Sequence, residues 1–151
     1  MGTQHKKPEG DRMTEKKSPA RVYVASATEQ YGLVEHFVDR LREVGIEISF
    51  EWTPDYRAGG FKPDAQLSDI HRRYVAKMDS CGVKEADLVW VITPDVKEHG
   101  CGMWVEMGMA LALGKRVIMS GKLARRTVFS ELAEACFQTH EEALVHIVGG
   151  G

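Results

Sequence analysis

The chain has 151 residues, of which 43% are hydrophobic, so it is long enough to form one globular domain with a substantial core. It carries 20 basic and 22 acidic residues, and this balanced charge gives no indication of binding to nucleic acid or to a membrane surface. No apolar run approaches the roughly 18 residues of a membrane span, so we expect a small-molecule partner, no nucleic acid and no membrane.

The first third of the chain predicts a strand, a helix and a second strand. Residues 1–19 are rich in Lys, Glu, Gly and Pro and are expected to form a flexible leader. Residues 21–25 form an apolar run typical of a buried strand, and apolar side chains over residues 33–44 recur at helical spacing. Residues 46–52 alternate between apolar and acidic or polar side chains, which predicts a half-buried strand. A long polar loop is expected over residues 53–64.

The remaining two thirds continue the alternation of helices and strands. A near-continuous apolar run over residues 87–93 is typical of a strand inside a parallel sheet. The glycine-flanked segment 100–114 predicts an apolar helix that carries a single carboxylate, Glu106. The further expected elements are a helix at 67–78, a strand at 117–119, helices at 128–136 and 141–147, and a disordered tail at 149–151.

This alternation predicts a single α/β domain over residues 20–148, built as an open parallel sheet in a flavodoxin/Rossmann-like three-layer α/β/α arrangement. Ligands of such sheets bind beyond the carboxyl ends of the strands, where the strand order reverses. If the order is flavodoxin-like, the loop that starts at Ala25 and Ser26 faces the loop that leads to Gly100, Gly102 and Met103. These five residues are the candidate substrate-binding positions of that crevice.

Glu106 is the candidate catalytic residue in this region. Its neighbours from Met103 to Leu113 are all apolar or glycine, and a carboxylate is rarely buried without a partner or a function. One interpretation is a nucleophile or base at the mouth of a pocket, kept ionised by the positive end of its helix. The alternative is a Glu on a solvated edge of the helix.

Asp79 is a second carboxylate that approaches the sheet, near the end of the helix before the 87–93 strand. Two carboxyl groups in one crevice can divide the roles of acid and nucleophile at a glycosidic bond. The alternative for Asp79 is a solvated helix residue. Gly100 and Gly102 could let backbone amides approach an anion or a sugar, or could form only a tight turn.

Neither metal nor cofactor is expected. The cysteines, Cys81, Cys101 and Cys136, share no metal-ligand spacing, and the six histidines include no HExxH pair. The phosphate-loop motif and the complete dinucleotide fingerprint are also missing. The odd number of cysteines favours a reducing compartment, so we expect a cytoplasmic protein.

The segments 86–93 and 102–118 resemble the nucleoside 2-deoxyribosyltransferase family. The strand at 22–26 and the position of Asp79, eight residues before Asp87, are also similar, so the resemblance covers about residues 21–118. It implies that Glu106 is the nucleophile that attacks the anomeric carbon of a deoxyribose, with a covalent glycosyl-enzyme intermediate. Asp79 would assist proton transfer to the leaving base.

The resemblance leaves the acceptor open. A second nucleobase would make the protein a transferase, and water would make it a hydrolase. Related hydrolases of deoxynucleoside 5′-monophosphates use hydroxyl groups for the phosphate, one of them in a segment similar to 127–130 of a neighbouring subunit, which makes Ser130 a candidate.

Gly100 departs from the family pattern, because transferases carry Asp and the monophosphate hydrolases Ser six residues before the nucleophile. We favour the transferase, with hydrolysis of the monophosphate as the alternative. A non-catalytic nucleotide-binding domain is the competing class. The apolar helices of so small a sheet also predict a homo-oligomer, a dimer or higher.

Overall fold

The computed structural model describes residues 17–59, 66–95 and 99–149, and it contains one sheet of parallel strands in the order β2-β1-β3-β4-β5. The flavodoxin-like order is therefore confirmed. The strand order reverses between β1 and β3, whose ends pair through Ser26 and Ile92. The strands are β1 (Arg21–Ser26), β2 (Glu47–Ile48), β3 (Leu88–Ile92), β4 (Arg116–Ser120) and β5 (Ala135–Phe137).

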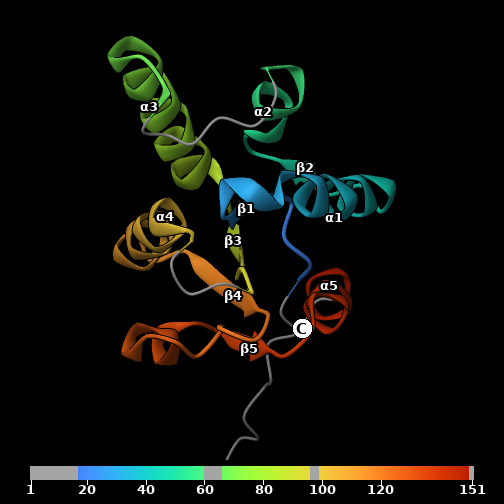
Figure 1. Cartoon of the computed structure of the whole chain (residues 1–151). Coiled ribbons are helices and arrows are strands. Elements are labelled where there is room, and N and C mark those ends of the chain that lie inside the picture. Colours follow the sequence, from blue (N-terminus) through green and yellow to red (C-terminus); the bar gives the residue numbers. More distant parts are fainter. Residues whose placement is uncertain (1–16, 60–65, 96–98, 150–151) are drawn as a thin grey trace, which may run out of the picture.

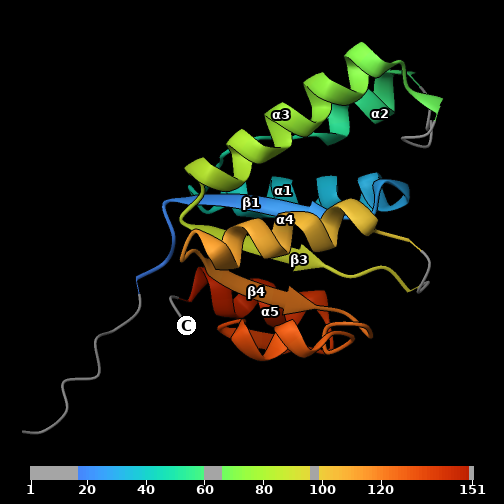
Figure 2. The ribbon, with the colours of Figure 1, turned by 90° about the vertical axis from the view of Figure 1, so that its left-hand side faces the viewer.

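Helices cover both faces of the sheet and form the expected three layers (Figure 1). One face carries α1 (Tyr31–Glu43) and α5 (His140–Val148), and the other carries α3 (Asp69–Glu85) and α4 (Cys101–Ala112). Two shorter elements, the 3-10 helix η1 (Thr28–Gln30) and the helix α2 (Thr53–Gly59), follow β1 and β2. Figure 2 shows α3 sloping away from the sheet toward α2, at the end where β1 and β3 point.

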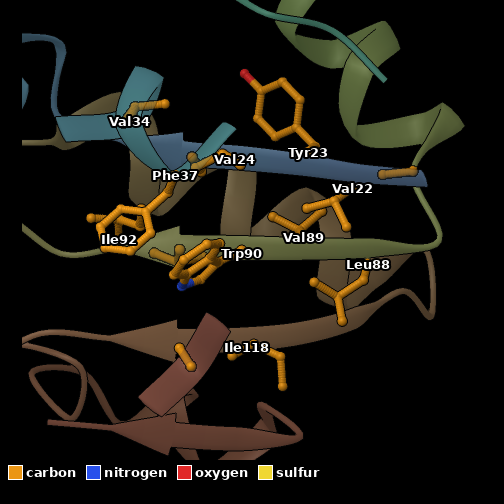
Figure 3. Packing of buried hydrophobic residues seen from close by; sticks show 14 of the residues in the cluster. Val22, Tyr23, Val24, Val34, Phe37, Leu88, Val89, Trp90, Ile92 and Ile118 are labelled. Carbon is orange, nitrogen blue, oxygen red and sulfur yellow. The ribbon is translucent and has the colours of Figure 1, made fainter. Parts of the chain in front are cut away.

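The core is centred on β3, whose five residues are all buried because helices pack on both of its faces. Trp90 points to the α1 side, where its ring lies close to Phe37 (Figure 3). The two rings are in edge-on contact, with their centroids 5.1 Å apart. Its indole N–H donates to the hydroxyl of Ser120 at 2.8 Å, so the polar end of this fully buried side chain is satisfied.

Three sequence predictions are wrong in detail. The strand expected at 46–52 is limited to Glu47–Ile48. The indole N–H of Trp52 donates to the carbonyl of Val24, so that carbonyl is not available for a backbone hydrogen bond to a longer β2. The loop expected at 53–64 begins with α2, since Thr53 and Pro54 are suited to the first turn of a helix. Residues 60–65 of that loop lie outside the described part.

The third error is the helix expected at 128–136. The segment instead forms the 3-10 helix η3 (Val128–Leu132) followed by β5, which pairs with the free edge of β4. An edge strand of three residues carries too little pattern to be recognised, and its register is set by contacts such as the backbone hydrogen bond from Glu134 N–H to the Val117 carbonyl.

The proposed leader and tail fall mostly outside the described residues. Residues 17–19 of the leader are described, and the Ser18 hydroxyl donates to the carbonyl of Val148 at 2.8 Å. Of the tail, Gly149 is described and caps α5. Within the described part of the chain, every helix is too short or too polar to cross a membrane.

Gly82 brings α3 against the sheet. A methyl group at this position would stand 2.7 Å from the Tyr23 ring on β1 and 2.7 Å from Cβ of Phe50, distances that real Cβ atoms do not adopt. The lack of a side chain at Gly82 therefore sets how closely α3 approaches β1.

We predict that Gly82→Ala lowers the free energy of unfolding by about 1–3 kcal/mol, because the added methyl overpacks this contact. Gly32→Ala in α1 is the matched control, since a methyl there meets no atom within 4 Å and removes the entropic cost of a helical glycine. Urea titrations of both variants measure the difference, and equal stabilities would contradict the proposed packing constraint.

Candidate functional site

A cavity of about 220 Å³ lies at the carboxyl ends of β1 and β3, where the sequence placed the ligand crevice. Residues from β1, α2, α3 and the start of α4 line it. The candidate residues that meet there are Ser26, Asp79, Gly100, Gly102, Met103 and Glu106. Segments that are up to 80 residues apart in the sequence, from Ser26 to Glu106, therefore converge on one space.

Two other candidates do not line this cavity. Ala25 is fully buried in β1, one residue before the lining begins at Ser26. Ser130 lies in η3 on the far side of α4, where it is only 2% exposed, and its hydroxyl has no hydrogen-bond partner among the described residues. In this chain, Ser130 is separated from Glu106.

Glu106 is half-buried and is the sixth residue of α4, so it lies beyond the first helical turn. The expectation that the helix N-terminus compensates its charge is therefore not met, since that effect fades within the first turn. A side chain from the sheet stabilises the carboxylate instead. The hydroxyl of Tyr23 donates a hydrogen bond of 2.9 Å to Oε1 of Glu106.

Tyr23 is a site residue that the sequence reasoning missed. Figure 3 shows its hydroxyl pointing away from β1 on the side opposite Phe37 and Trp90. Burial raises its pKa well above the usual 10, and the charges of Glu106 and Asp79 and hydrogen bonding to both raise it further. The hydroxyl is thus a permanent donor. A Tyr within an apolar strand was the available signal, because a buried phenol requires a partner.

Asp79 approaches the same hydroxyl from α3. It is half-buried, its Oδ1 is inaccessible to solvent, and its carboxylate acts on Tyr23 both by charge and by hydrogen bonding. The structure thus brings Glu106 and Asp79 together around one phenol, although they come from different helices.

The backbone conformation explains why glycine occupies position 100. Gly100 precedes α4 with φ of 87°, in the left-handed region that favours glycine, so Asp or Ser would be strained there. Gly102 has open space around its Cα and faces the cavity. The backbone requirement at Gly100 supports the tight-turn interpretation of that residue.

An aromatic wall closes the α2 side of the cavity. The rings of Trp52 and Tyr56 are in edge-on contact, with their centroids 5.7 Å apart. Both residues line the cavity and also an adjoining pocket of about 200 Å³. That pocket extends past Asp79 to Phe50 and Tyr74. Flat aromatic surfaces next to a carboxylate suit a planar, partly polar group.

No set of three or more His, Cys, Asp or Glu side chains within residues 17–59, 66–95 and 99–149 is arranged to hold a metal ion.

The comparisons with known proteins identify the fold. The chain matches no protein-family model and no curated protein. It is similar to the solved structure of the Clostridium botulinum CMP N-glycosidase BcmB, with a TM-score of 0.51 and 23% sequence identity. The similarity covers 82% of this chain and 94% of that one, so it extends over most of both chains.

For a reaction in which Glu106 takes part, we predict that Tyr23→Phe lowers turnover by about 10- to 100-fold, because the free energy of one hydrogen bond to a charged group is lost. Because Glu106 loses a donor, the acidic limb of the pH–rate profile moves to higher pH. Tyr31→Phe removes a hydroxyl outside the cavity and is the control. An unshifted acidic limb in Tyr23→Phe would show that the phenol does not act on the carboxylate.

Proposed function

We propose that the protein cleaves the N-glycosidic bond of a 2-deoxynucleoside and transfers the deoxyribose to another nucleobase. The observation that carries this proposal is the meeting of Glu106 and Asp79 around the hydroxyl of Tyr23 in a cavity with an aromatic wall. Retaining glycosidases use a pair of carboxyl groups about 5 Å apart, one as nucleophile and one as acid.

In the proposed reaction, a carboxylate oxygen of Glu106 attacks the anomeric carbon of the sugar. The C–N bond breaks and its electron pair goes to the base nitrogen. Asp79 carries a proton when the substrate is bound and transfers it to the leaving base, which returns Asp79 to the carboxylate. A second base then attacks the same carbon, its N–H proton returns to Asp79, and Glu106 leaves as a carboxylate. Tyr23 orients Glu106 by donating to Oε1 throughout.

The leaving base fits the aromatic side of the site. Asp79 lines both the main cavity and the adjoining pocket with Trp52 and Tyr56, so a base in contact with these rings lies within reach of the proposed acid. In this arrangement, the sugar lies next to Gly102 and Glu106 of α4.

Hydrolysis is the second candidate, and the fold similarity to a CMP N-glycosidase favours it. In a hydrolase, water takes the place of the second base at the anomeric carbon. The covalent intermediate and the roles of Glu106 and Asp79 are the same in both reactions, so only the acceptor differs. A nucleotide-sensing domain without catalysis is the third possibility, and it requires no covalent step.

The test is release of free base from each deoxynucleoside and deoxynucleotide, with and without a second base. We expect release that Glu106→Gln abolishes, while Glu43→Gln on the exposed end of α1 has no effect. A new nucleoside in the presence of the second base identifies transfer, and base release without one identifies hydrolysis.

A covalent trap separates the enzyme from a sensing domain. A 2-fluoro-2-deoxy sugar analogue should leave a stable adduct on Glu106, detectable by mass spectrometry of the intact chain and its peptides. Absence of base release from every substrate, together with absence of an adduct, would rule out the proposed enzyme.

We also propose that the protein is a homo-oligomer. An apolar groove of about 590 Å³ runs between α4 and η3, and the exposed side chains along it include Val105, Phe129 and Leu132, each at least 60% exposed. An apolar surface of this kind is typical of an interface. Val105 is adjacent to Glu106, so a second subunit on this groove would lie beside the site.

We predict that Val105→Glu and Phe129→Glu each convert the oligomer to a monomer. Each substitution would bury a carboxylate in the apolar interface without a partner of opposite charge. Sedimentation velocity measures the change. Ile70→Glu is the control, since Ile70 is 82% exposed on α3, away from the groove. A wild-type protein that sediments as a monomer at micromolar concentration would overturn this proposal.

A further inference from the structure

Three hydrogen-bonded side chains lie at the carboxyl end of β4, outside the lining of the candidate cavity. The indole N–H of Trp90 on β3 donates to Oγ of Ser120, the last residue of β4, at 2.8 Å. The same oxygen lies 2.8 Å from Nδ1 of His140, the first residue of α5. Because Trp90 and Ser120 are fully buried, this Trp90–Ser120–His140 cluster connects the core of the sheet to a helix that covers it.

The donors of the cluster fix the protonation state of His140. An indole N–H can only donate, so Oγ of Ser120 accepts from Trp90 and has its own proton left to donate. Among the described residues, the only other hydrogen-bond partner of this hydroxyl is Nδ1 of His140. That nitrogen must therefore accept, which requires a neutral imidazole with its proton on Nε2.

The packing around the His140 ring also favours the neutral form. The ring is half-buried and lies edge-on to Phe37 of α1, with the ring centroids 5.8 Å apart. The backbone after β4 is close as well, since a methyl group at Gly121 would stand 3.1 Å from Cε1 of His140. The position at the start of α5 adds the positive end of the helix dipole, which opposes a cation. Burial lowers the pKa of His140 below the usual 6.5.

Two carboxylates near His140 act in the opposite direction. The charges of Asp95, which follows β3, and of Glu141 on α5 raise the pKa of His140, but by less than burial lowers it. Each carboxylate also has a cation nearby. Nζ of Lys122 lies 3.8 Å from Oδ1 of Asp95, and Nη1 of Arg40 on α1 lies 2.6 Å from Oε1 of Glu141. These cations partly offset the attraction of the carboxylates for a protonated imidazole.

Protonation of His140 would disrupt the cluster. With a proton on Nδ1, the imidazole and the indole would both donate to Ser120, whose own proton would then have no acceptor among the described residues. A buried cation and an unsatisfied buried hydroxyl both cost free energy. The carbonyl of Ser120 also accepts from N–H and Oγ1–H of Thr93, each at 2.9 Å. Thr93 directly follows β3, so a disturbance at Ser120 reaches the connection that leads to α4.

We propose that the Trp90–Ser120–His140 cluster is an acid-sensitive latch, which fastens α5 and the end of β4 to the core while His140 is neutral and releases them when the imidazole is protonated. This inference does not depend on the proposed reaction.

The direction of the pH dependence follows from the lowered pKa of His140 in the folded protein. At mildly acidic pH the unfolded chain binds a proton at this residue more readily than the native state does. The latch therefore contributes its full stability above about pH 6.5, where an exposed histidine titrates. That contribution is lost as the pH falls from there toward the lower pKa of the folded state.

The indole N–H resonances of the ¹⁵N-labelled wild-type protein test the latch directly. Between about pH 8 and pH 5, the Trp90 indole resonance should shift along the same titration curve as the ring of His140, because Ser120 links the two side chains. Trp52 is the internal control, since its indole N–H donates to the carbonyl of Val24 and should not follow that curve. A Trp90 resonance that is insensitive to the titration of His140 would overturn the inference.

Urea titrations of His140→Asn measure the contribution of the latch to stability. The amide oxygen of Asn can accept from Ser120 but cannot be protonated. From about pH 7.5 to pH 5.5, the unfolding equilibrium constant of the wild-type protein should rise by up to about tenfold more than that of the variant, since unfolding takes up one additional proton. His36→Asn removes an exposed histidine that also contacts Phe37, and it should keep the wild-type pH dependence.

Equal pH dependence of stability in the wild-type protein and in His140→Asn would overturn the latch. If His140→Asn does not fold, the Trp90 resonance of the wild-type protein decides the question alone.

Discussion

The site depends on a single hydrogen bond between the sheet and a helix, from the hydroxyl of Tyr23 to Oε1 of Glu106. Tyr23 is fully buried on β1, where its backbone pairs with Val89 of β3. A phenol held in this way stays protonated, because burial and two neighbouring carboxylates oppose its ionisation. The position of Glu106 is thereby tied to the sheet.

The second carboxylate depends on how closely α3 approaches the same strand. Gly82 lies against the Tyr23 ring, and Asp79 lies almost one turn earlier on the helix. One aromatic side chain therefore locates both acidic groups, with its ring packed against α3 and its hydroxyl directed at α4. Figure 2 shows α3 diverging from α4 beyond this contact, where the cavity and the groove lie.

The surroundings of these carboxylates divide the site by chemistry. Aromatic rings from Trp52 and Tyr56 lie on the α2 side, whereas the open backbone at Gly102 lies on the α4 side. The similarity to the CMP N-glycosidase, at 23% identity, concerns the fold, so the functional proposal rests on the side chains themselves.

Much of the architecture could be predicted from the chain alone, because hydrophobic periodicity is a local property. The buried run at β3, the helices α1, α4 and α5, and the α/β class all follow from such patterns. The short edge strands β2 and β5 were misjudged, since two or three residues carry little pattern and pairing partners decide their extent.

The same division applies to the site. A carboxylate in an apolar helix singled out Glu106 by itself. Asp79 followed from its position near the end of the helix before β3, and the family resemblance supplied its role. Only the tertiary structure decided that Tyr23 joins them and that Ser130 lies elsewhere in this chain. The reason is physical: burial and contact between residues distant along the chain arise from packing, which local sequence patterns do not specify.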